Sequence, residues 1–176
     1  MHQRRPQPAA NLGTNMLKRL CVITWLIGLP SCGGSTSTPT PTPTQAMFVV
    51  AALPNPVTAV RCNPLCTGTS GATFPFSATM TITFQESAGV GGNVNSITIT
   101  PATGTGSLPP LTYGSDVVIQ RSGTNHIAAR GALSFPFTLV YSTGATGAAN
   151  LVVNISAQLS DDRGNQFTVT GQVSVI

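Results

Sequence analysis

The chain has 176 residues, of which 41% are hydrophobic and only 7% are charged, and its formal net charge is +4. Four of the eight basic residues and none of the acidic ones precede position 32, so the remainder is neutral, with four arginines against four carboxylates. A neutral chain without lysine lacks the positive surface that binds phosphate backbones, which excludes nucleic acid as a partner.

A short basic segment near the start is followed by an apolar run. Lys18 and Arg19 precede residues 20–29, which are mostly apolar. Such a run is too short to cross about 30 Å of hydrocarbon as a helix, but it is typical of the central region of a signal peptide. Because Met16 begins a complete signal, we interpret residues 1–15 as a disordered upstream extension and residues 16–31 as the signal peptide.

The signal ends in Leu29-Pro30-Ser31-Cys32, which resembles the lipobox of bacterial lipoprotein precursors. The resemblance implies cleavage before Cys32, a diacylglycerol on its thiol and an acylated amino terminus, and two or three acyl chains anchor a protein stably. Gly33 stands where an aspartate would favour retention in the inner membrane, so the resemblance implies the outer membrane of the cell envelope. The alternative is an ordinary signal peptide that is cleaved nearby and leaves no lipid.

Residues 32–45 follow as a disordered linker rich in threonine and proline. Residues 35–45 read STSTPTPTPTQ, and alternating prolines favour an extended spacer about 30 Å long. Residues 46–176 number 131 (176 minus 45), which suffices for one folded domain.

Cys62 and Cys66 are the cysteines that remain after Cys32. In an oxidising compartment such a pair indicates a small loop closed by a disulfide, which contributes about 2 kcal/mol to stability. Zinc would need more ligands than the one histidine after Cys32 could add, and redox pairs usually have two intervening residues. We therefore predict a structural disulfide and no metal or cofactor.

Alternating apolar residues predict β-strands along the rest of the chain. Residues 73–84 give the clearest pattern, with an apolar side chain at every second position. A first strand over 48–61 is interrupted by Pro54 and Pro56, as at a sheet edge. Further strands are expected at 95–99, 117–121, 133–141, 151–159 and 167–175, with a loop over 101–115. About seven strands without helical periodicity predict an all-β fold, a single antiparallel two-sheet sandwich that resembles immunoglobulin and fibronectin type III domains.

Candidate chemical groups are few. Asp116, His126 and a serine could make a hydrolytic triad, but a serine-rich chain offers that combination by chance, and the usual catalytic motifs are missing from the sequence, so we expect no enzyme. Asp161 and Asp162 are weak candidates for calcium ligands. The competing interpretation is that they form a hairpin turn with Gly164, and we favour it.

The direction of the strands predicts which loops lie together, because alternate loops of an antiparallel sandwich share an end. We expect the linker to enter beside the turns at 89–92, 122–126 and 161–165. The other end is expected to carry the disulfide loop and the loops at 101–115 and 142–149. Leu108, Leu111 and Tyr113 are the side chains of that end best suited to contacts. They form either a recognition surface or a cap over the open end of the core.

These observations lead to the hypothesis of a membrane-anchored bacterial lipoprotein whose immunoglobulin-like domain has a structural, adhesive or protein-binding role in the cell envelope. Its partners would be the membrane, through the lipid, and an envelope protein or glycan. The alternative is a carbohydrate-binding module on the cell surface. Such modules typically present several exposed aromatic side chains, and here only Tyr113 is expected to be free.

Overall fold

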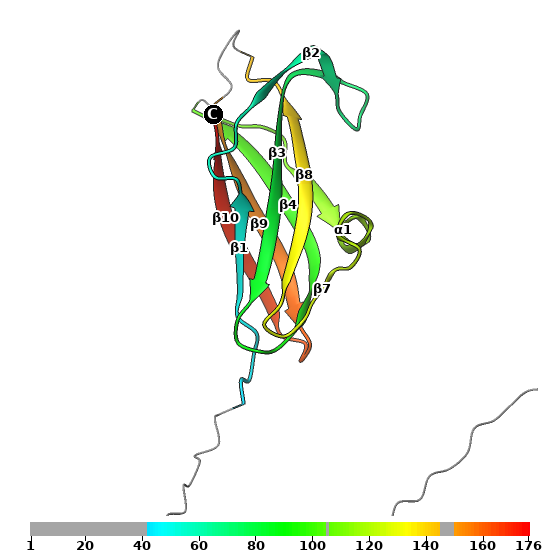
Figure 1. The fold of residues 1–176 in the computed structure, drawn as a ribbon, viewed down its shortest axis with the longest axis vertical. Coiled ribbons are helices and arrows are strands. Elements are labelled where there is room, and N and C mark those ends of the chain that lie inside the picture. Colours follow the sequence, from blue (N-terminus) through cyan, green and yellow to red (C-terminus); the bar gives the residue numbers. More distant parts are fainter. Residues whose placement is uncertain (1–41, 105, 145–149) are drawn as a thin grey trace, which may run out of the picture. The chain divides into compact units, whose positions relative to one another are not determined.

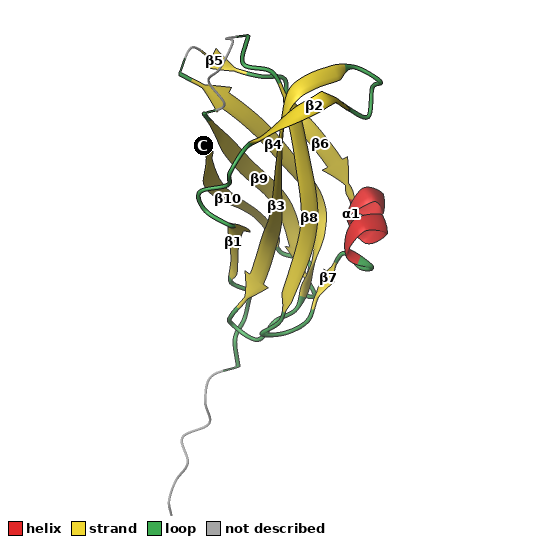
Figure 2. Cartoon of the chain, turned by 45° about the horizontal axis from the view of Figure 1, so that its top comes forward, coloured by secondary structure: helices red, strands yellow, loops and turns green. Residues whose placement is uncertain are grey.

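A computed structural model of the chain describes residues 42–104, 106–144 and 150–176. The predicted signal peptide, Cys32 and the linker up to residue 41 lie outside the described residues. The described residues form two antiparallel β-sheets packed face to face as a sandwich (Figures 1 and 2). The predicted all-β class is therefore confirmed.

The first sheet is built around β3 (Thr73–Glu86). β3 pairs along one edge with β8 (Ala132–Tyr141), and along the other with β1 (Phe48–Leu53) and then β2 (Val60–Thr67). Because β1 and β2 are both antiparallel to β3, they run in the same direction and form one interrupted edge strand. The sequence predicts this interruption from its two prolines.

The second sheet has the order β10–β9–β4. Its long strands are β4 (Gly92–Thr103), β9 (Leu151–Asp161) and β10 (Gln166–Val175). Three short strands follow one another along the far edge of β4. They are β5 (Gly106–Ser107), β6 (Leu111–Gly114) and β7 (His126–Ile127). If β1 with β2, and β5 to β7, each count as one interrupted strand, the described residues fill seven strand positions, as predicted.

The core lies between the sheets and is formed by every second residue of the long strands. Ile82, Phe84 and Phe135 are fully buried, whereas the threonines that alternate with them in β3 lie on the outer face. Burying one such apolar side chain contributes about 2 kcal/mol. A strand shifted by one residue would expose its whole apolar set, so the period-two pattern specifies which face of each strand is inside.

The expected strand at 117–121 is wrong, because these residues belong to the helix α1 (Ser115–Ser122). Asp116 in the first turn and Arg121 in the last turn both interact favourably with the helix dipole. Gly123 adopts a φ of 79° and donates its N–H to the carbonyl of Ile119, which ends the helix as glycine commonly does. These signals at the two ends of the segment outweigh its short apolar run at 117–119, which is ambiguous between strand and helix.

The expected loop over 101–115 is also wrong in most of its length. β4 continues to Thr103, and β5 and β6 fold back onto it, with Leu111 opposite Ile99 and Tyr113 opposite Ile97. The prolines at 109 and 110 separate β5 from β6, since proline cannot donate to a strand ladder. The segment therefore forms an edge strand in pieces.

The disulfide between Cys62 and Cys66 is present, but it lies within β2 and not between two strands. Arg61 is opposite Phe76 and Cys66 is opposite Phe74, so five steps along β2 match two steps along β3. The extra residues form a bulge, and the disulfide joins its two sides, with Cα atoms 5.4 Å apart. The sequence predicts the disulfide itself. It does not show that the residues between the two cysteines bulge out of a strand paired with β3.

The described turns lie at the ends that strand direction predicts, whereas residues 145–149 of the expected loop at 142–149 lie outside the described residues. At the end where the chain enters the domain, the N–H of Ala46 donates to Asp161 and the N–H of Met47 donates to Glu86. This entry end therefore includes the β9–β10 hairpin and the end of β3. β2 and the C-terminus lie at the opposite end, here called the distal end (Figure 1).

Candidate functional site

An apolar hollow of about 360 Å³ opens at the distal end, between β8 and the segment that joins β5 to β6. Its lining includes Phe74, Leu108, Leu111, Leu139, Val140 and Tyr141. None of the described residues that line it carries a charge at neutral pH. We call this feature the distal hollow.

Both sheets contribute to the distal hollow. Leu139 and Tyr141 of β8 form part of its inner wall and are almost fully buried, at 3% and 2% exposure. Leu108 packs against the core, whereas Leu111 remains 37% exposed on the opposite wall. Leu108 and Leu111 thus meet at one site, as the recognition hypothesis requires, and Leu108 also covers part of the core.

Tyr113 does not belong to the distal hollow and is not free for contacts, which corrects the expectation from the sequence. Its ring lies 5.7 Å from that of Phe135 and 5.9 Å from that of Phe137. The guanidinium of Arg121 lies 5.1 Å above the same ring. Burial raises the pKa of the Tyr113 hydroxyl, although the positive charge of Arg121 acts in the opposite direction. Tyr113 is thus a contact between α1, β6 and the core.

A buried carboxylate, Glu86, lies at the entry end and was not expected from the sequence. Its side chain is 1% exposed and accepts hydrogen bonds from the backbone N–H groups of Met47, Ala88, Gly89 and Arg130, at 2.7–3.2 Å. Burial alone would raise its pKa, but these four amides together lower the pKa to about 2. The available signal was its position, because Glu86 continues the inward-facing series of β3.

Asp161 is the second buried carboxylate of the entry end, at 3% exposure. Its oxygens accept from the backbone N–H groups of Ala46, Arg163 and Asn165 and from the side-chain amide of Asn165, at 2.8–3.2 Å. Burial would raise the pKa of Asp161, and these donors lower it on balance. With both oxygens bonded to amides, the structure favours the turn-forming interpretation of Asp161 over a calcium ligand.

Asp162 lies next to Asp161 but faces another residue. Its carboxylate lies 3.2 Å from Nε2 of His126, and both side chains are about half exposed. His126 is therefore paired with Asp162, while Asp116 lies in the first turn of α1. No group of three acidic, histidine or cysteine side chains suited to a metal ion occurs among the residues that the structure describes.

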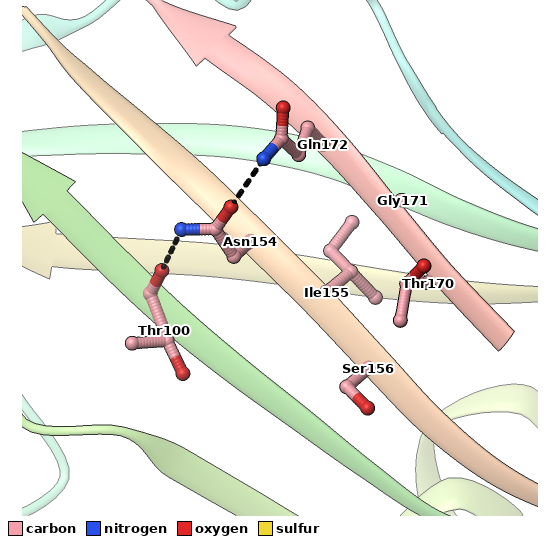
Figure 3. Close-up of a pocket in the computed structure, with 7 residues that line it drawn as sticks. All are labelled: Thr100, Asn154, Ile155, Ser156, Thr170, Gly171 and Gln172. Atoms are coloured by element: carbon pink, nitrogen blue, oxygen red, sulfur yellow. Dashed lines mark hydrogen bonds between the residues drawn. The ribbon is translucent and has the colours of Figure 1, made fainter. Parts of the chain in front are cut away.

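A second, polar groove of about 420 Å³ lies along β4, β9 and β10 (Figure 3). The side-chain amide of Gln172 donates to Oδ1 of Asn154 at 2.7 Å, and Asn154 donates to the carbonyl oxygen of Thr100 at 3.4 Å. Ser156 and Thr170 add hydroxyl groups beside this row. All of these side chains are neutral, so the groove is rich in hydrogen-bonding groups but not in charge.

Comparison with known proteins supports the fold and leaves the function open. No protein-family model and no curated protein matches the sequence. The chain is similar to the X-ray structure of target SoR45 of the Northeast Structural Genomics Consortium, with a TM-score of 0.51 and 9% identity over 77% of this chain and 89% of that chain. At this identity the similarity concerns the fold alone. No helix in the described part of the chain is long and apolar enough to cross a membrane.

Proposed function

We propose that the protein is a lipid-anchored envelope protein whose immunoglobulin-like domain binds a protein partner at its distal end. The proposed anchor is Cys32, on the strength of the resemblance of residues 29–32 to a lipobox. The order β1–β3–β8 in one sheet and β10–β9–β4 in the other supports an immunoglobulin-like Greek key, because consecutive strands repeatedly change sheet.

The observation that carries the proposal is the position of the distal hollow relative to the point of entry. Ala46 and Met47 are bonded to buried carboxylates at the entry end, so the linker leaves the domain there. The distal hollow opens at the other end, with Leu111 exposed on its wall. In a protein anchored at Cys32, that arrangement turns an apolar, concave surface away from the membrane, where a partner can reach it.

The anchor is tested by expressing the full chain in a Gram-negative bacterium and measuring the mass of its amino-terminal peptide. We expect Cys32 with a diacylglycerol and an added acyl chain, and we expect Cys32→Ala to release the domain from the membrane fraction. A wild-type protein that is free of the membrane, with an unmodified first residue, would refute the anchor.

The binding role is tested by capture from envelope extract with the wild-type chain and two variants. Leu111→Ser removes an exposed leucine from the distal hollow, whereas Val49→Ser removes an exposed valine (52%) from β1 as a matched control. We expect a protein that the wild type and Val49→Ser retain and that Leu111→Ser loses. Equal capture by all three would refute a recognition role for the distal hollow.

A second candidate is the carbohydrate-binding function, and the polar groove on β4, β9 and β10 favours it. Amide and hydroxyl side chains held by lateral hydrogen bonds match the neutral hydroxyl groups of a glycan. The test is binding of neutral oligosaccharides by calorimetry, with Asn154→Ala, which removes the central amide, and Thr168→Ala outside the groove as a control. Binding that Asn154→Ala abolishes supports this candidate, and binding that is unchanged by it removes the groove from consideration.

A further inference from the structure

We propose that the partner of the distal end is an extended, neutral and apolar peptide segment that adds as a strand to the open edge of β8 and places alternate side chains in the distal hollow. The inference rests on the proposed recognition role of the distal end and adds the binding mode and the chemical class of the partner. Its basis is the juxtaposition of an unpaired strand edge with an apolar hollow.

The first step is that β8 has one edge without a ladder partner. Among the described residues, β8 forms a ladder with β3 alone. An edge strand presents unpaired N–H and C=O groups, and these are the groups to which an added strand bonds.

The second step identifies which residues of β8 face this open edge. The carbonyl of Gly131 accepts from the N–H of Glu86, so position 131 faces β3. In an antiparallel ladder alternate residues face the same neighbour, so the odd-numbered residues of β8 face β3 and the even-numbered ones face the edge. Pro136 agrees with this assignment, because it lies in an unbroken ladder although it has no N–H.

The third step is that α1 and the distal hollow divide this edge between them. α1 packs against β8 (Figure 2), and Tyr113 covers Phe135 and Phe137 there. The outward-facing backbone N–H and C=O groups of Thr138 and Val140 lie nearer the end of β8, where Leu139 and Val140 line the distal hollow. A short extended segment can therefore bond to Thr138 and Val140 while its side chains reach the hollow.

The fourth step concerns the charge of the partner. The described residues that line the distal hollow are uncharged, and burial raises the pKa of the Tyr141 hydroxyl, which keeps it neutral. A charged side chain would lose its hydration there without gaining an opposite charge. The complementary segment is therefore neutral, with apolar side chains at alternate positions.

The test measures binding of the peptide acetyl-Thr-Val-Thr-Leu-Thr-Val-Thr-amide to the full chain. Thr138→Pro removes one edge N–H but keeps the backbone hydrogen bonds to β3, and Ser134→Pro makes the same change at an edge position outside the distal hollow. Thr138→Val controls for the lost hydroxyl, which bonds Thr79. We expect Thr138→Pro to weaken binding about tenfold, as the loss of one backbone hydrogen bond would, and the other two variants to bind as the wild type does.

Two N-methylated peptides keep the test decisive if Thr138→Pro does not fold. One is methylated on the threonine nitrogens and the other on the valine and leucine nitrogens. In an added strand only one of these two sets bonds to β8, so we expect only one of the peptides to lose binding. Loss of both, loss of neither, equal effects of Thr138→Pro and Ser134→Pro, or a wild-type chain that does not bind the parent peptide would overturn strand addition. If Leu111→Ser alone abolishes binding, the distal hollow remains the recognition site and only the strand mode fails.

Discussion

The two buried carboxylates at the entry end show how single residues join the linker to the domain. Glu86 holds the N–H of Met47, and Asp161 holds the N–H of Ala46. A buried carboxylate is costly unless several donors surround it, and each of these accepts several amide hydrogen bonds. The start of β1 is therefore fixed by charge-assisted hydrogen bonds in addition to its ladder with β3.

This arrangement predicts that stability falls in acid. The folded-state pKa of Glu86, about 2, lies below its ordinary value of 4.5, so its contribution is complete above pH 4.5 and is lost as the pH falls from 4.5 towards 2. Glu86→Gln should be less stable than the wild type at pH 7, and the difference should shrink below pH 4.5. Urea denaturation followed by circular dichroism measures both.

Gly92 provides a second prediction for a single residue. A Cβ there would meet the carbonyl oxygen of Ser160, Cζ of Phe48 at 2.7 Å and Cα of Asp161 at 2.9 Å. Gly92→Ala should lower the free energy of unfolding by about 3 kcal/mol, the upper range for overpacking a core. Gly104→Ala is the matched control, because a Cβ at that position meets no atom of the described residues within 4 Å, and it should be neutral in the same denaturation experiment.

Among the elements, α1 shows most clearly where the local sequence leaves the secondary structure ambiguous and the tertiary structure decides it. The segment around Val118 has three consecutive apolar residues, 117–119, and also an acidic start, a basic end and a following glycine. Short apolar runs are ambiguous between strand and helix. Here β4 pairs with β6 and then with β7, and α1 occupies the part of the chain between them, where it packs on β8.

The helix predicts very different effects on stability for two neighbouring residues. Val118 is fully buried, whereas Ile119 is 46% exposed. Val118→Ala should lower the free energy of unfolding by about 2 kcal/mol, and Ile119→Lys should change it by less than about 0.5 kcal/mol. Thermal denaturation of the two variants checks this. A larger loss for Ile119→Lys would contradict the burial pattern of α1.

At the scale of the whole molecule, one segment joins the two sheets along the edge formed by β1 and β10. Between β1 and β2, the carbonyl of Val57 accepts from the N–H of Ile176, and the N–H of Val57 donates to the carbonyl of Ser174. The N–H of Ala59 donates to the carbonyl of Ile176. Val57 thus pairs in parallel with Val175 at the end of β10, while β1 and β2 remain in the other sheet. These bonds tie the C-terminal residues of the second sheet to the segment that joins β1 to β2 of the first sheet.

Removal of residues 175 and 176 should therefore destabilise the whole sandwich in a single transition. The deletion removes the side chain of Val175, which is only 1% exposed and belongs to the core. It also removes the backbone hydrogen bonds of Ile176 to the segment before β2. We expect a loss of about 3 kcal/mol. Ile176→Ser keeps the backbone bonds and changes a side chain that is 54% exposed, so it should be nearly neutral. Separate transitions for the two sheets would contradict the coupling.

The sequence by itself determined the class of the fold, the inner face of each long strand and the end of the sandwich at which each described turn lies. The side-chain period of two can be read within each strand, and the alternation of direction follows from the order of the strands along the chain. Neither requires knowledge of which distant residues meet. Only the tertiary structure decided that residues 115–122 are helical, that the disulfide closes a bulge, that Tyr113 is covered and that Leu108 and Leu111 border a hollow with β8. The same holds for Glu86, whose donors come from three separate segments. Each of these depends on which distant residues become neighbours, and no local pattern encodes that.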